Sequence, residues 1–201
     1  MEAGSPHDVP YMFPLVLNVT ALPVMLIGGV GIISRIAALE EYGATALHIF
    51  ANEPDHELVA SAGPRLQMRW PDARDFHEIR PKLVFISDTD DTHAAALRAE
   101  AHAVGALVHV HDRVPLCDIH MPARIRRGHL QVTVSTDGTA AGLARHIREY
   151  LENHVFGPEW AGRVEEMAAA RRQWKLEGLS FVDLGKAVAA FVRERGWLKR
   201  P

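Results

Sequence analysis

The fold expected for the first part of this 201-residue chain follows from the segment Pro23-Val-Met-Leu-Ile-Gly-Gly-Val-Gly31. Val24–Ile27 is a short apolar run between a proline and glycines, which is typical of a buried strand. Residues 32–42 follow with apolar side chains at helical spacing, and Gly43 suits the end of that helix. Residues 46–51 indicate the next strand. A strand, a glycine turn, a helix and a second strand in about 30 residues form a βαβ unit.

This glycine turn is typical of a site for the pyrophosphate of a dinucleotide. A phosphate can approach the backbone closely where no Cβ stands in its way, and the helix that follows supplies free N–H groups and a partial positive charge. Glu53 and Asp55 lie just past the second strand, where an acid would bind the ribose hydroxyls. Glu53 favours NAD over NADP, because it would repel a 2′-phosphate. The dinucleotide motif G-x-G-x-x-G begins here at Gly29 and has Ser34 in place of its last glycine. The alternative is an ordinary tight turn that binds no nucleotide.

Strands and helices continue to alternate beyond this unit. Thr92 is expected to cap an alanine-rich helix that runs to about Val104, where Gly105 ends it. The strand candidates are residues 14–19 (an edge strand), 24–27, 46–51, 66–70 (weak), 83–87 and 106–111. This order predicts a parallel sheet flanked by helices. Its predicted cofactor-binding residues are Gly28, Gly29, Val30, Gly31, Ile32, Glu53 and, in the acidic loop after residue 87, Asp88.

The sequence pattern changes after Asp112. Residues 130–135 alternate strictly between apolar and polar, which predicts a strand with one wet face or an interface face. The helix candidates that follow are residues 138–153, 158–174 and 180–197. We expect Trp160, Trp174 and Trp197 to be packing anchors of these helices.

Composition excludes several classes of protein. The chain is 48% hydrophobic and 23% charged, as soluble globular proteins are. A net charge of −3 gives no indication of a nucleic-acid partner, and no apolar run is long enough for a membrane span. Cys117 is the single cysteine, which excludes an internal disulfide and fits a reducing cytoplasm. We therefore expect a cytoplasmic protein with Cys117 in its core.

Several segments in the middle of the chain carry a family resemblance. They are Val108–Asp112, Cys117–Pro122, Ile125–Leu130, Ser135–Thr139 and Leu143–Arg145. In this order they resemble the strand ending in aspartate, the C-D-F-x-x-P segment, the I-x-R-G-x-L turn and the S-T-G-G loop before L-A-R of the precorrin-2 dehydrogenase module of sirohaem synthases. The glycine turn and residues 83–85 match in order and spacing as well, so the resemblance covers about residues 11–152.

The resemblance implies the NAD-dependent oxidation of precorrin-2, a tetrapyrrole, to sirohydrochlorin. Some relatives also insert iron to make sirohaem. It further implies an α/β fold with a Rossmann-type parallel sheet in residues 1–112, a small α+β dimerisation segment in residues 113–152 and a helical C-terminal domain in residues 153–201. The chain would then act as a homodimer.

The resemblance also identifies two catalytic candidates, Asp112 and Ser135, and His111 is a third because it stands beside Asp112. Asp112 matches the active-site aspartate of the family, and in a partly apolar cleft with a raised pKa it could take the proton released in the oxidation. His111 beside it could tune its proton affinity, and Ser135 could bind the substrate or a cofactor phosphate. The alternatives are a capping role for Asp112 and a simple loop cap for Ser135.

A local cluster of arginines suits the carboxylates of the substrate. Its members are Arg124, Arg126, Arg127, Arg145 and Arg148. We predict that Arg124, Arg127 and Arg145 bind substrate. A solvated face or a dimer contact is the alternative.

Two departures from the family leave other functions open. Val30 replaces the third glycine of the family's turn, and Asp137 adds a negative charge to the loop after residue 135. The alternatives are a bifunctional dehydrogenase and ferrochelatase, a non-catalytic binder of nucleotide or tetrapyrrole, and an unrelated NAD-binding regulatory domain. The histidines at 109, 111, 120 and 129 carry no metal-ligand signature, so we expect no resident metal.

Overall fold

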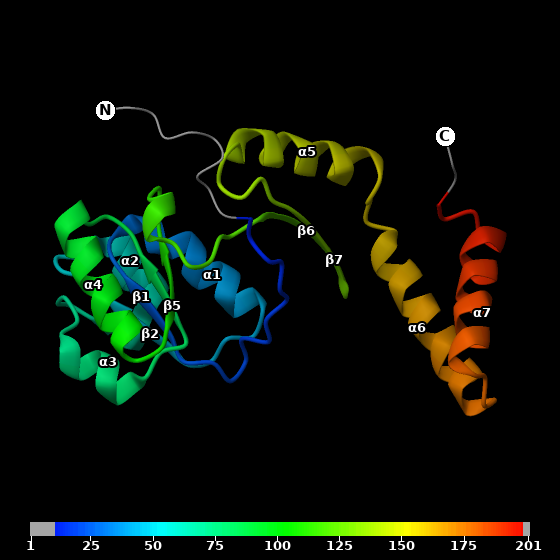
Figure 1. Ribbon diagram of the computed structural model, residues 1–201, viewed down its shortest axis with the longest axis horizontal. Helices are drawn as coiled ribbons and strands as arrows, with labels where there is room; N and C mark the ends of the chain where they lie inside the picture. The colour runs from blue at the N-terminus through cyan, green and yellow to red at the C-terminus, as the bar shows by residue number, and fades with distance from the viewer. Residues whose placement is uncertain (1–10, 199–201) are drawn as a thin grey trace. The chain divides into compact units, whose positions relative to one another are not determined.

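The computed structural model describes residues 11–198 and divides into two compact units, the first ending at Met121 and the second beginning at Pro122. The first unit is an α/β domain of the Rossmann type (Figure 1). Its elements are β1 (Val24–Ile27), the 3-10 turn η1 (Val30–Ile32), α1 (Ile33–Glu41), β2 (Leu47–Phe50), α2 (His56–Ala62), η2 (Gly63–Arg65), β3 (Leu66–Gln67), α3 (Ala73–Ile79), β4 (Leu83–Ile86), α4 (Asp91–Ala103), β5 (Leu107–Val110) and η3 (Val114–Leu116).

The five strands of this unit form one parallel sheet in the order β3-β2-β1-β4-β5. The chain passes from β1 to β2 on one side, and β4 then lies against the other side of β1. The direction of winding therefore reverses between β1 and β4, which is the position where open α/β sheets have their ligand crevice. The parallel sheet expected from the sequence is confirmed.

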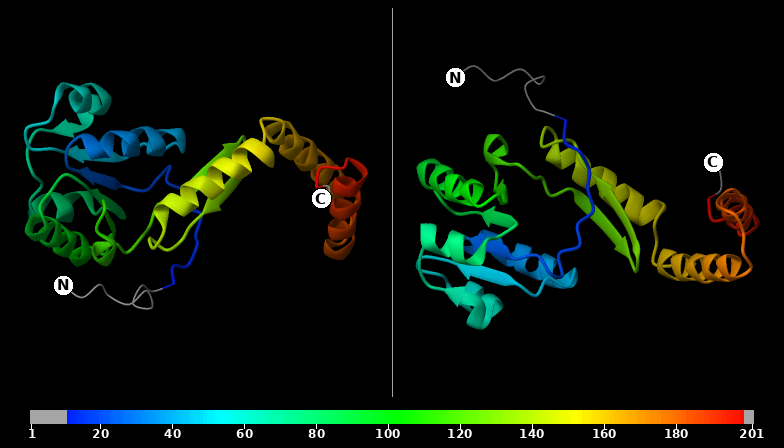
Figure 2. Two further views of the ribbon diagram at one scale, coloured as in Figure 1. Left: turned by 90° about the horizontal axis from the view of Figure 1, so that it is seen from above. Right: turned by 60° about the horizontal axis from the view of Figure 1, so that its bottom comes forward.

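Helices cover both faces of this sheet (Figures 1 and 2). Val24 and Leu26 of β1 pack into a cluster with apolar residues of α1 and α2. Met25 and Ile27 point the other way and pack with residues of α3 and α4. All four side chains of β1 are fully buried, because both faces of the strand are covered.

Residues 113–121 pack onto the first unit instead of starting a separate segment at residue 113. The N–H of Asp118 donates to the carbonyl of Val108, and the N–H of Val108 donates to the Asp118 carboxylate over 2.9 Å. Arg98 and His102 of α4 bind the same carboxylate at 3.1 and 2.7 Å. These contacts place the boundary between the units at Met121 and not at residue 112.

The second unit combines a β-hairpin with three helices. Its elements are β6 (Ala123–Arg127), β7 (Leu130–Val134), α5 (Ala141–His154), α6 (Trp160–Leu176) and α7 (Phe181–Glu194). The strands β6 and β7 are antiparallel, and α5 lies along them, as Figure 2 shows. Phe191 of α7 makes edge-to-face contacts with Trp174 and Trp197, with ring centroids 5.6 and 5.5 Å away. The helical C-terminal region and the packing role of these tryptophans are confirmed.

Three local predictions are wrong. Residues 14–19 form no strand; Leu15 and Val16 are exposed, and no described strand pairs with them. The residue that caps α4 is Asp90 and not Thr92, because the Asp90 carboxylate accepts the His93 N–H at 2.8 Å. The strand expected at residues 66–70 comprises only Leu66–Gln67 in the structure. Among the described residues, no helix is both long enough and apolar enough to cross a membrane.

Candidate functional site

The candidate site lies at the carboxyl ends of three neighbouring strands, β1, β4 and β5. The glycine turn follows β1, Ser87 and Asp88 follow β4, and His111 and Asp112 follow β5. Parallel strands end at the same edge of a sheet, so these three segments meet there. Most residues expected to bind the cofactor, and two of the three expected in catalysis, are therefore brought together.

Gly28 is required by the close approach of β4. Its φ is +140°, and a Cβ at this position would lie 2.2 Å from the carbonyl oxygen of Ser87. Ile32 at the other end of the turn is buried in the core and fixes η1 to the sheet. Val30 between them is 54% exposed, so its side chain does not fill the interior of the turn.

The carboxylate of Asp88 binds the backbone donors of the glycine turn. The N–H groups of Gly29 and Gly31 donate to its Oδ2 over 3.1 and 2.9 Å, and the Ser87 hydroxyl donates to the same oxygen over 2.9 Å. Burial pushes the pKa of Asp88 upward, but the hydrogen bonds from Gly31, Ser87 and Gly29 outweigh it and hold the pKa below its ordinary value. The donors suited to a phosphate oxygen thus already hold an anion of the chain itself.

This geometry bears directly on whether a dinucleotide fits. Two converging amides beside a bare backbone are the right donor set for a phosphate oxygen. With the Asp88 carboxylate on them, a pyrophosphate fits only after that carboxylate has moved. Ser87 was not predicted from the sequence, because a serine after a strand carries no signal of its own.

The two acids after β2 have different surroundings. Asp55 caps α2, where its carboxylate accepts the Leu58 N–H at 2.8 Å. Glu53 is exposed and has a φ of +54°. Both acids are exposed, but only Glu53 lies outside a helix cap.

Asp112 lies at the exposed carboxyl end of β5. Its side chain is 89% exposed, and its Oδ2 lies 3.5 Å from Nε2 of His111, which is itself 54% exposed. The residue has a φ of +56°, which turns the chain sharply after β5. A proton acceptor here is open to water and to a ligand arriving at the sheet edge.

The other polar groups near β5 are structural. Burial lowers the pKa of His109, whose Nδ1 lies 3.1 Å from the Ile119 carbonyl. Cys117 packs against the core, and its thiol donates to the Val110 carbonyl at 3.1 Å, as expected of a core cysteine. Within residues 11–198 no group of three or more His, Cys, Asp or Glu side chains is arranged to hold a metal ion.

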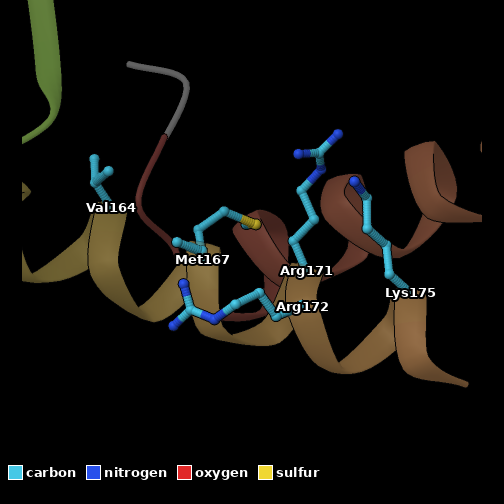
Figure 3. Close-up of a pocket in the computed structure, with 6 residues that line it drawn as sticks. Val164, Met167, Arg171, Arg172 and Lys175 are labelled. Carbon is cyan, nitrogen blue, oxygen red and sulfur yellow. The ribbon is translucent and has the colours of Figure 1, made fainter.

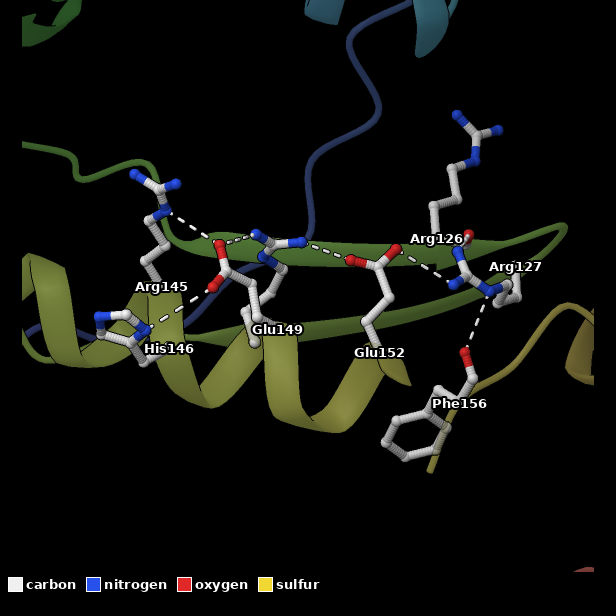
Figure 4. A network of polar contacts seen from close by, with 8 residues as sticks. Arg126, Arg127, Arg145, His146, Glu149, Glu152 and Phe156 are labelled. Atoms are coloured by element: carbon white, nitrogen blue, oxygen red, sulfur yellow. Dashed lines mark hydrogen bonds and ion pairs between the residues drawn. The ribbon is translucent and has the colours of Figure 1, made fainter. Parts of the chain in front are cut away.

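The arginines predicted to bind substrate belong to the second unit, where Arg127 and Arg145 contact carboxylates of α5 (Figure 4). Arg127 of β6 donates to the Phe156 carbonyl at 3.0 Å and to Glu152 at 3.1 Å. Arg145 pairs with Glu149 at 2.9 Å, and Arg148 binds both glutamates. Arg127 is only 20% exposed, so its main contacts join the hairpin to α5 and to the segment after it.

Ser135 and Asp137 organise the loop after β7. The Asp137 N–H donates to Oγ of Ser135 at 3.2 Å, and Asp137 has a φ of +51°. The Thr139 hydroxyl closes the same loop on the Thr136 carbonyl at 2.6 Å. These contacts are those of a capped loop, and Ser135 lies in a different unit from His111 and Asp112.

A separate pocket of about 370 Å³ lies on α6 (Figure 3). Its lining residues are Val164, Met167, Ala168, Arg171, Arg172 and Lys175. All of them come from one helix, and none belongs to the predicted site. The pocket is thus one face of α6, apolar in its first half and basic in its second.

Comparisons with known proteins agree with the sequence motifs of both units. The family described as "Putative NAD(P)-binding" matches residues 15–123, and the family "Sirohaem biosynthesis protein central" matches residues 127–154. The siroheme synthase of Saccharophagus degradans is 31% identical over 164 residues, which are 80% of this chain and 35% of that protein. The siroheme synthase of Cronobacter sakazakii is 32% identical over 162 residues, 79% of this chain and 34% of that protein.

A solved structure named "SirC, precorrin-2 dehydrogenase" has the same fold. The TM-score is 0.68 at 18% identity, and the match covers 94% of this chain and 93% of that one. The chain spans about a third of the length of the curated siroheme synthases it matches. The NAD(P)-binding match over more than half of the chain, followed by the match to the central family, shows that the chain belongs to the NAD(P)-binding family of sirohaem-biosynthesis proteins.

Proposed function

We propose that this chain catalyses the NAD-dependent oxidation of precorrin-2 to sirohydrochlorin in sirohaem biosynthesis. The observation that carries the proposal is the glycine turn at the reversal point between β1 and β4, where two backbone N–H groups converge on an anion. Membership of the family supports the same activity. The name of the structural relative, a precorrin-2 dehydrogenase, agrees with it.

The residues at the sheet edge suit the parts of a dinucleotide. The Gly29 and Gly31 amides would hold the pyrophosphate once Asp88 has moved, and Ile32 keeps the turn in place. Glu53 at the end of β2 would accept hydrogen bonds from the ribose hydroxyls and repel a 2′-phosphate, which favours NAD. A bound nicotinamide supplies the hydride acceptor.

His111 and Asp112 would handle the proton that leaves the substrate. Both follow β5, the strand next to β4, so they lie along the sheet edge from the glycine turn. Oxidation removes a hydride and a proton, and a carboxylate with an imidazole 3.5 Å away can accept that proton and pass it to water. Most of the rate enhancement would come from aligning the two rings.

The substrate would reach this edge as a polycarboxylate. We propose that Arg124 and Arg145 contribute to its binding and that Ser135 orients it, in a homodimer in the cytoplasm, as the family resemblance implies. Arg127 was predicted in the same role, but its contacts with Phe156 and Glu152 indicate that it holds the hairpin to its neighbours.

The test is a coupled assay with enzymatically made precorrin-2 and NAD. Formation of NADH together with the absorption spectrum of sirohydrochlorin would support the proposal. Asp112→Ala should lower turnover at least about 100-fold if this carboxylate handles the proton. Asp112→Asn, which keeps the shape and loses the charge, should be similarly slow.

One observation favours a second function, a nucleotide or tetrapyrrole binder without turnover. It is the occupation of the glycine turn by Asp88, which opposes productive binding of the cofactor and therefore opposes turnover. Dinucleotide binding without NADH formation would favour this second function. Equal rates in the wild type and in Asp112→Ala would reject the role given to Asp112.

A further inference from the structure

Asp88 is bound in the way that a phosphate would be bound. Three donors, the N–H groups of Gly29 and Gly31 and the hydroxyl of Ser87, converge on its Oδ2 within 3.1 Å. Helix-start amides that converge on one oxygen form an anion site. In this chain, the anion that uses the site is a side chain from the end of β4.

The absence of a side chain at Gly31 is explained by the same contact. A Cβ at Gly31 would lie 2.9 Å from Oδ2 of Asp88 and 3.0 Å from Oγ of Ser87. The close approach that the glycine permits is thus used by the carboxylate of the chain. The motif that predicts a pyrophosphate site is satisfied without a pyrophosphate.

We propose that Asp88 limits the affinity of the site for its cofactor, because its carboxylate competes with the dinucleotide pyrophosphate for the amides of Gly29 and Gly31. This inference rests on the proposed function, because it concerns how tightly the same site binds its cofactor. The binding-competent state is the one in which the carboxylate has left the amides. The apparent dissociation constant is then the intrinsic one divided by the population of that state.

The loop that carries Asp88 leaves little room for it to withdraw. Arg113, from the segment after β5, donates to the Thr89 carbonyl and to the Asp91 carboxylate. Asp90 caps α4 directly after the loop. On the other side of Asp88, the Ser87 N–H donates to the Ile27 carbonyl at 2.9 Å. Because the backbone is held on both sides of Asp88, the carboxylate vacates the amides mainly by side-chain rotation, and it stays close to the incoming phosphate. The displaced carboxylate and the phosphate are both negative and repel each other at close range. Asp88 therefore opposes binding first by occupying the amides and then by this repulsion.

The experiment measures binding to the full-length chain by isothermal titration calorimetry. The probes are NAD, NADH and inorganic pyrophosphate, the last of which reports on the turn alone. The variants are Asp88→Asn, which suits the φ of +52° and removes the charge, and Asp88→Ala, which also frees the amides. Asp90→Asn is the matched control, because it removes the same charge from the same loop and asparagine still caps a helix.

We expect both Asp88 variants to bind NAD and pyrophosphate about tenfold or more tightly than the wild type, with Asp90→Asn unchanged. A purely structural role for Asp88 predicts the opposite sign, because loss of its hydrogen bonds would loosen the turn and weaken binding. Affinities equal to or below that of the wild type, or an equal gain in Asp90→Asn, would overturn the proposal.

The same data separate this inference from the proposed function. If wild type and Asp88 variants bind NAD with equal affinity, the function stands and the competition does not. If the Asp88 variants gain pyrophosphate binding but no chain binds NAD, the competition stands and the function fails. If no chain binds either probe, the competition is refuted, because removal of the carboxylate has freed no site.

Discussion

Replacement of Gly28 by alanine should unfold the first unit far more readily than any other glycine replacement near the site. The added Cβ would lie 2.2 Å from the Ser87 carbonyl oxygen, and the φ of +140° is one that alanine rarely adopts. The unfavourable φ alone costs about 1–3 kcal/mol. The carbonyl cannot retreat easily, because the N–H of the same residue donates to Ile27 within the sheet at 2.9 Å. We expect a loss of about 4 kcal/mol or more in the free energy of unfolding.

Two matched variants separate the two contributions. Gly63→Ala has a φ of +56° and nothing within 4 Å of the new Cβ, so it measures backbone strain alone, about 1–2 kcal/mol. Gly31→Ala has no positive φ, and its Cβ meets mainly the movable side chains of Asp88 and Ser87. It should cost about 1–2 kcal/mol. The cost should fall when Asp88→Ala is combined with it, since the two sites share one contact.

The assay is hydrogen exchange of the amides of β1 and β4, which exchange through unfolding of the first unit. Urea unfolding followed by circular dichroism gives an independent midpoint and slope. The expected order of destabilisation is Gly28→Ala, then the other two. A Gly28 variant no less stable than Gly63→Ala would show that β1 and β4 do not approach each other as described.

Two further predictions concern charged groups away from the sheet edge. Arg127→Met should destabilise the second unit by about 2 kcal/mol, because two hydrogen bonds from a charged donor are lost. The affinity for NAD should stay unchanged. Lost turnover with unchanged stability would instead make Arg127 a substrate ligand. Asp118 should contribute to acid stability: burial raises its pKa, but His102 and the Val108 N–H outweigh this and hold the pKa below its ordinary value. Its contribution is therefore complete above the unfolded pKa and is lost as the pH falls through the lower folded pKa, so below about pH 4 the wild type should approach the stability of Asp118→Asn. Parallel curves for the two proteins from pH 7 to pH 2 would contradict this assignment.

The sequence predicts the centre of the fold well because the signals there are local. β1 and β4 are continuous apolar runs because both of their faces are buried, and β2 and β5 are mainly apolar with one histidine each. The helices α2 and α3 are not predicted, since seven residues are too few to show a helical period. β6 has three arginines in five residues, and only its pairing with β7 makes it a strand.

The boundary at Met121 and the lack of a strand at residues 14–19 have a common cause. Both depend on contacts with distant parts of the chain. Asp118 is hydrogen-bonded to Arg98 of α4 and to Val108 of β5, and the local sequence of residues 113–121 does not predict these contacts. The segment 14–19 has an apolar composition, but a strand also needs a neighbour for its hydrogen bonds.

The candidate site was predicted in its position and only partly in its chemistry. The order of motifs puts the glycine turn, Asp88 and Asp112 at one edge of the sheet, and the structure agrees. The Asp112 side chain is 89% exposed, which the sequence does not predict, because exposure depends on which other segments pack at the end of β5. The pairing of Arg127 with Glu152 could not be predicted from the sequence either, because the two residues are 25 positions apart in the chain.

Asp88 shows why a glycine motif alone does not establish which anion is bound. The bare backbone that admits a phosphate admits a carboxylate equally well, and the residue that supplies it lies 57 positions from Gly31. The Asp88 carboxylate opposes NAD binding in the free protein, where it occupies the amides, and again after its displacement, where it lies near the phosphate. Asp88→Asn should then lower the KM for NAD while kcat stays near the wild-type value, because the carboxylate opposes binding and takes no part in hydride transfer. A lower kcat with an unchanged KM would place Asp88 in the chemical step instead.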